Sequence, residues 1–181
     1  MSSSGRDATV VIIMHGPGET DVEAWTRTVS RGEAKALMDT VLAEAKASGA
    51  EILMMDGAMV FGTDHVKSAF FHATKATAEG RNSSESLAME TLLYASGERQ
   101  LSSAIRKMAV GDATESVVVA VLKGHFSPRE GWSKLPRIGT MRDRAKLAGF
   151  GITEREMSTV TEERLTDLVL EKVAAVDVIK K

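Results

Sequence analysis

The chain has 181 residues, 43% hydrophobic and 27% charged, which is ordinary for one globular domain. It contains no cysteine, which excludes a disulfide scaffold, thiolate zinc sites and a cysteine nucleophile. No apolar run approaches the roughly 18 residues that a membrane span needs. Residues 1–7 lack an apolar signal core and are typical of a flexible lead-in. We therefore expect a soluble cytoplasmic protein that does not act at a membrane.

The net charge of −2 is unevenly distributed along the chain. Between Lys123 and Lys146 there are seven bases and two acids, so this tract carries +5 and the rest of the chain carries −7. The tract also contains Phe126 and Trp132, a mixture that proteins use to stack single-stranded bases between phosphate contacts. A solvated loop with aromatic packing anchors explains the same residues equally well.

The first half of the chain alternates strand and helix patterns. A β-branched run predicts a strand over 8–14, ended by the turn His15-Gly16-Pro17-Gly18. Apolar spacing over 34–45 predicts an amphipathic helix that ends near Gly49, with Ser30 and Glu33 as a capping box. The run over 51–56 predicts a second strand.

A block of helical patterns follows. We predict helices over 64–79, over 87–95 with a capping box at residues 82–85, and over 101–108. The segment 87–95 is apolar nearly all round, which is typical of a central buried helix. A strand is predicted over 116–122, then a loop with a helix near 141–147, and a C-terminal helix to Val176 capped by Thr159 and Glu162. The expected fold class is α/β (α+β): a small antiparallel or mixed sheet packed with a helical block, as one domain over 8–181.

The sequence carries no phosphate-loop, nucleophile-elbow or zinc-protease motif. His65 and His72 stand seven residues apart on one side of a helix, about 10 Å along its axis, which is unsuited to a metal. We interpret them as a stripe away from the apolar face, able to meet phosphates or base edges. Ordinary structural histidines explain the spacing at least as well. Two alternatives stay open: a regulatory domain that binds a nucleotide at His15 to Gly18, and an enzyme that uses Glu90 and a histidine.

Three stretches of sequence together resemble one known family. They are residues 61–73, residues 88–105, and residues 150–156 followed by 165–177. The most specific is Leu92-Leu93-Tyr94-Ala95-Ser96-Gly97-Glu98-Arg99-Gln100. These stretches look like archaeal members of the TPRKB family, the kinase-binding subunit of the KEOPS (EKC) complex. The resemblance covers roughly residues 50–122 and 148–178, and the basic segment 123–147 departs from it.

The resemblance implies a subunit without an active site. We expect no cofactor or metal, and the sequence leaves open whether the isolated chain is a monomer. The resemblance implies docking on the PRPK-like kinase/ATPase subunit of KEOPS. Docking should use an exposed apolar patch, and the C-terminal helix and the face around Phe71 are the two candidates. The resemblance also implies binding of the tRNA 3′ CCA end in support of threonylcarbamoyladenosine modification next to the anticodon. The expected RNA-binding residues are His65, Lys67, His72, Lys75, Arg99, Gln100, Lys123, Arg129 and Arg137.

Overall fold

The structure is a computed structural model and describes residues 22–137 and 143–179. Four strands and seven helices are defined in this part of the chain. In chain order they are β1 (Glu23–Thr28), α1 (Ala34–Ser48), β2 (Glu51–Asp56), α2 (Thr63–Ala78), α3 (Leu87–Ser96), α4 (Leu101–Met108), β3 (Ser116–Lys123), β4 (Ser133–Lys134), α5 (Arg144–Phe150), α6 (Glu154–Met157) and α7 (Asp167–Ile179). The strand predicted over 8–14 and the turn at His15 to Gly18 lie outside the described residues.

The strands form one antiparallel sheet in the order β2-β3-β1-β4. The expected α+β class, a small antiparallel sheet packed with a helical block, is confirmed. Strand β1 was not predicted from the sequence, because Glu-Ala-Trp-Thr-Arg-Thr has no continuous apolar run. Its pairing with β3 places Trp25 opposite Val119 and Arg27 opposite Val117. The central strand β3 thus holds in place a neighbour whose own sequence is largely polar.

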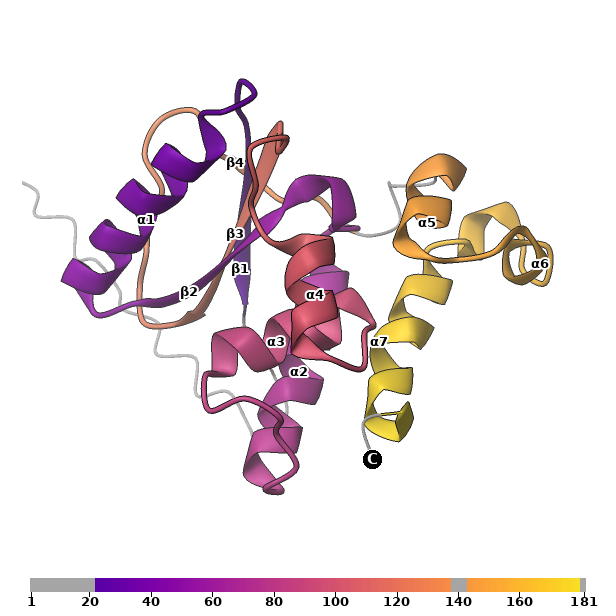
Figure 1. The fold of residues 1–181 in the computed structure, drawn as a ribbon. Coiled ribbons are helices and arrows are strands. Elements are labelled where there is room, and N and C mark those ends of the chain that lie inside the picture. The colour runs from indigo at the N-terminus through magenta and orange to yellow at the C-terminus, as the bar shows by residue number, and fades with distance from the viewer. Residues whose placement is uncertain (1–21, 138–142, 180–181) are drawn as a thin grey trace, which may run out of the picture.

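The two faces of the sheet are covered by different helices (Figure 1). Alternate side chains of β3 point to opposite faces, as strand geometry requires. Val118 and Ala120 pack with the helical block of α2, α3 and α4, whereas Val117 and Val119 pack under α1. Helix α3 is buried from Glu90 to Ser96, which confirms the prediction of a central helix. The sheet therefore separates two surfaces that have different helices and different chemistry.

The C-terminal helices add a third apolar cluster beside the start of α2. Phe61 packs there with Leu147 and Phe150 from α5, and with Leu165 and Val169. Helix α7 then runs along α2, away from this cluster (Figure 1). No helix among the described residues is both long enough and apolar enough to cross a bilayer.

The predicted helix caps were only partly correct. Glu33 accepts the N–H of Ser30, but no side chain caps the start of α1. The capping box predicted at residues 82–85 is wrong, since Ser86 is the N-cap of α3. The cap at Thr159 and Glu162 is also wrong, because the Thr159 hydroxyl donates to the carbonyl of Glu156. A complete capping box instead joins Thr153 and Glu156 at α6.

Candidate functional site

The turn between α3 and α4 exposes the end of the most specific sequence motif. Gly97 ends α3 in the left-handed conformation at φ 66°, which glycine adopts without strain. A Cβ atom at Gly97 would lie 3.2 Å from the Cβ atom of Lys172 in α7, so this turn packs closely against the C-terminal helix. Arg99 and Gln100 follow it, and both side chains are exposed. Arg99 has no hydrogen bond or ion pair with any described residue and is available to an anionic partner.

Beneath this turn, the half-buried ammonium of Lys107 forms hydrogen bonds at the C-terminal end of α3. Lys107 donates to the carbonyl of Ser96 at 2.7 Å and to the carboxylate of Glu98 at 3.2 Å. Its Nζ atom lies 3.9 Å from the centre of the Phe150 ring. Burial lowers the pKa of Lys107, although the hydrogen bond that it donates to Glu98 opposes this effect. The Lys107 side chain therefore stabilises the turn and does not extend into solvent.

His65 is buried with no exposed surface, so the prediction that it lies on an exposed stripe is wrong. Its Nδ1 atom accepts the N–H of Phe61 at 3.2 Å, and its Nε2 atom lies 2.7 Å from the carbonyl of Ala95. These partners assign the Nε2–H tautomer. Burial lowers the pKa of His65 to about 4; the hydrogen bond to Ala95 opposes this effect, and the charges of Lys146 and Lys107 add to it. The imidazole is consequently neutral at pH 7 and joins α2 to α3.

His72 lies at a junction of α2, α3 and α7 rather than on a free surface. Its Nδ1 atom lies 2.7 Å from Asp177 Oδ2, and Tyr94 donates its hydroxyl to Asp177 Oδ1 at 2.6 Å. Arg81 contacts the same carboxylate at 3.4 Å. Burial raises the pKa of Asp177, but hydrogen bonds from Tyr94 and His72 outweigh it, and the pKa is lowered overall. The charged carboxylate therefore fastens α7 to the helical block.

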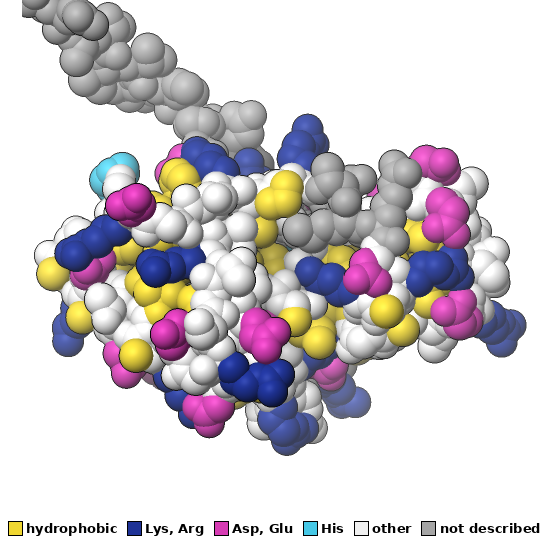
Figure 2. Space-filling model, turned by 90° about the horizontal axis from the view of Figure 1, so that it is seen from above, with side chains coloured by type: hydrophobic (Ala, Val, Ile, Leu, Met, Phe, Trp, Pro, Cys, Tyr) yellow, Lys and Arg dark blue, Asp and Glu magenta, His cyan; other side chains and the backbone are white. Residues whose placement is uncertain are grey.

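The other predicted RNA-binding residues do not form one cluster. Lys67 and exposed Lys75 lie on α2, and Arg137 reaches the first turn of that helix, 3.3 Å from Asp64. Arg129 instead lies on the α1 side of the sheet, 2.8 Å from Glu44, and Lys123 is exposed at the end of β3. In the view from above, basic and acidic side chains are interspersed (Figure 2). The sheet thus divides the predicted set between two faces.

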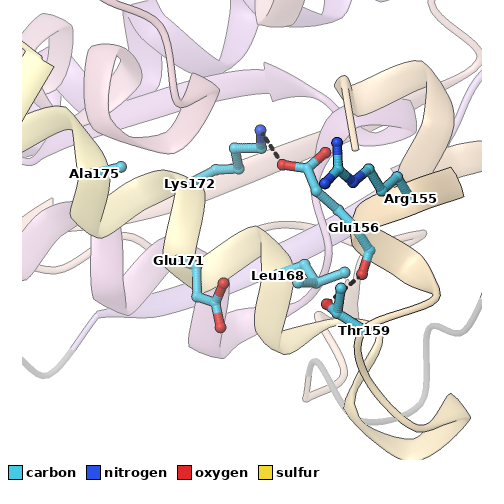
Figure 3. Close-up of a pocket in the computed structure, with 7 residues that line it drawn as sticks. All are labelled: Arg155, Glu156, Thr159, Leu168, Glu171, Lys172 and Ala175. Carbon is cyan, nitrogen blue, oxygen red and sulfur yellow. Dashed lines mark hydrogen bonds and ion pairs between the residues drawn. The ribbon is translucent and has the colours of Figure 1, made fainter. Parts of the chain in front are cut away.

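A pocket of about 370 Å³ between α6 and α7 was not predicted from the sequence (Figure 3). Lys172 forms an ion pair with Glu156 across the pocket, at 2.7 Å, and Leu168 forms part of the pocket wall. The hydrogen bond from Lys172, with those from Thr153, lowers the pKa of Glu156 to about 2. The spacing of Thr153 and Glu156 signals a capping box, but only the packing of α7 reveals the pocket.

Glu90 is buried in α3 and has a structural role in the described residues. Its carboxylate accepts the backbone N–H groups of Ser83 at 2.9 Å and Ser84 at 3.0 Å. These bonds fasten the segment before α3 to the helix itself. In the part of the chain that the structure describes, no three His, Asp or Glu side chains are grouped to hold a metal ion.

The fold is of the α+β class, with a four-stranded antiparallel sheet and exposed helical surfaces. Residues 29–138 match the family described as kinase binding protein CGI-121. Because the match covers more than half of the sequence, the chain belongs to this family of kinase-binding proteins. The resemblance to the TPRKB family is thereby confirmed. Comparison with curated proteins gives no match.

Proposed function

We propose that this protein is a non-catalytic accessory subunit of a KEOPS-type complex. It binds and stimulates the atypical kinase/ATPase subunit and holds the 3′ CCA end of tRNA during threonylcarbamoyladenosine synthesis in the cytoplasm. The observation that carries this proposal is the match to a kinase-binding family over residues 29–138. It is supported by the Leu92–Gln100 motif, whose first half is buried and whose Arg99 and Gln100 are exposed.

The kinase-docking face is proposed to lie on α2 and the end of α7. Phe71 is 43% exposed, Val178 is 70% exposed and Ile179 is 41% exposed. They are three of the five exposed large apolar side chains among the described residues. Helices α2 and α7 pack together and are joined by His72 and Asp177. Apolar side chains at the centre of an interface provide most of its binding energy once water is removed.

Replacing Phe71 with serine is expected to weaken binding to the kinase-like subunit about tenfold, or about 1.4 kcal/mol. The reason is that an apolar anchor loses its buried contact area. Leu42 on α1 provides a matched control, because it is 41% exposed but lies on the opposite side of the sheet. Titration of the purified kinase-like subunit after RNase treatment measures both variants. Weaker binding by Leu42→Ser, with Phe71→Ser unchanged, would place docking on the other face.

The RNA surface is proposed to use Lys67, Lys75, Arg99 and Gln100. His65 is left out because its side chain has no exposed surface. His72 is already engaged by Asp177, and Lys123, Arg129 and Arg137 have lower priority, since two of them are ion-paired. Arg99 contributes a guanidinium that can pair with phosphate in two hydrogen bonds or stack on a base.

Substituting Arg99 with alanine is expected to weaken binding of intact tRNA more than binding of tRNA without its CCA end. About three neutralised phosphates give a slope near −2 for log affinity against log salt, from about −0.7 per phosphate. Fluorescence anisotropy with the two tRNAs at several salt concentrations measures both quantities. Arg31→Ala is the control, because Arg31 is also exposed but pairs with Glu115 outside the helical block. Equal losses for the two tRNAs, or a slope near zero, would contradict a tail site.

A further inference from the structure

Two neighbouring cavities follow α1 on the face of the sheet opposite the helical block. The first has a volume of about 220 Å³ and includes Arg27, Leu37 and Trp132 in its lining. The second has a volume of about 500 Å³ and includes Ser48 and His125. Glu44, Phe126 and Arg129 line both of them. The two cavities therefore adjoin each other between α1 and the loop over residues 124–132, and together they are called the groove.

Arg27 is the unusual residue of this groove. Strand alternation turns Trp25 and Arg27 toward α1, while Ala24 packs on the other face. The side chain is half-buried, yet it has no ion pair or hydrogen bond with any residue that the structure describes. The loop backbone covers its guanidinium: a Cβ atom at Gly131 would lie 3.5 Å from the guanidinium carbon. Burying part of an unpaired charge is unfavourable, so this arrangement favours an anionic ligand.

The rest of the groove limits which anion it fits. Arg129 already forms an ion pair with Glu44 at 2.8 Å. Arg27 is therefore the arginine of the lining that has no ion pair with a described residue. Leu37, Phe126 and Trp132 add apolar walls beside it. A nucleic-acid backbone carries one negative charge per nucleotide, which is more than the one unpaired guanidinium of the lining can balance. A single carboxylate next to an apolar side chain complements the groove better.

We infer that this groove binds an extended peptide segment of a protein partner that carries an apolar side chain beside a carboxylate. The apolar side chain fills the 220 Å³ cavity and the carboxylate pairs with Arg27. The rest of the segment follows the 500 Å³ cavity past His125. This docking surface lies across the sheet from the proposed kinase and RNA surfaces and does not depend on them.

The test uses two capped hexapeptides, Gly-Ser-Phe-Glu-Gly-Ser and its counterpart with Gln in place of Glu. The readout is the NMR shift of the Trp132 indole N–H, with cytidine monophosphate as a competing probe. The Glu peptide should bind with a dissociation constant below about 1 mM, and the Gln peptide about tenfold more weakly. In the Arg27→Gln variant this tenfold difference should disappear, because the pairing cation is gone. Arg106→Gln, on α4 across the sheet, should keep it.

Arg27→Lys is the second variant, since it keeps the charge but loses the two-point pairing, and it should retain part of the difference. Thermal unfolding of every variant confirms that each is folded. The inference fails if Arg27→Gln still distinguishes the two peptides, or if neither peptide shifts Trp132 at about 5 mM, well above the expected constant. It also fails if cytidine monophosphate binds more tightly than the Glu peptide, which would assign the groove to nucleotides.

Discussion

Replacing Phe61 with alanine is expected to lower the free energy of unfolding by about 3–5 kcal/mol, the cost of deleting a fully buried phenyl ring. Phe61 has no exposed surface, and its ring meets that of Phe150 edge-on, with centroids 5.2 Å apart. The Nζ atom of Lys146 lies 4.9 Å from the same ring and donates to the carbonyl of Val60. A cavity at Phe61 would therefore disturb the contact between α5 and the start of α2.

Urea denaturation with Phe71→Ala as the control measures this effect. The control removes a phenyl ring of the same size that is 43% exposed, so it should cost much less. Hydrogen exchange should localise the added flexibility of Phe61→Ala to α5 and the beginning of α7, which share its apolar cluster. If Phe61→Ala lowered the free energy of unfolding as little as Phe71→Ala is expected to, the Phe61 cluster would contribute little to stability.

The second large effect expected is a loss of stability on mild acidification that depends on His65. Burial lowers the pKa of His65 in the folded protein to about 4 from an ordinary value of 6.5. Between these values the unfolded chain binds a proton that the folded protein does not, so stability falls as pH falls. With 1.36 kcal/mol per pKa unit, the loss between pH 7 and pH 5 is about 2 kcal/mol.

A comparison with His65→Asn isolates this contribution. Asparagine places its amide oxygen where Nδ1 accepts from Phe61, and it does not titrate in this range. Urea unfolding at pH 7 and pH 5 should therefore show a fall about 2 kcal/mol larger for the unaltered protein than for the variant. Parallel curves for the two proteins would mean that His65 is solvated and titrates normally.

Several elements could be predicted from local sequence, because the pattern of apolar residues within each one is enough to indicate a helix or a strand. The segment Leu87–Ala95 is apolar nearly all round, with Glu90 as its one charge, so a buried central helix is the expected outcome. The β-branched run in β3 likewise predicts a strand covered on both faces. The left-handed turn at Gly49 followed from a glycine at the end of an apolar pattern.

The candidate sites were harder to predict, because exposure depends on partners distant in sequence. His65 borders the apolar face of α2, and its burial results from Ala95 in α3 and Phe150 in α5. His72 was placed correctly on α2, but its contact with Asp177 joins residues 105 positions apart. Arg27 could not be identified as a site residue from the sequence, because β1 was not predicted and a single arginine forms no periodic pattern.

The sequence alone determined the α+β class, the buried α3, the central strand β3 and the resemblance to kinase-binding proteins. These features follow from side-chain periodicity and from one contiguous motif, which neighbours along the chain specify. Only the tertiary structure decided which basic side chains form ion pairs, that His65 is buried, and that the predicted basic residues lie on two faces of the sheet. The physical reason is that burial and charge pairing depend on groups brought together by packing, and local sequence does not encode those distances.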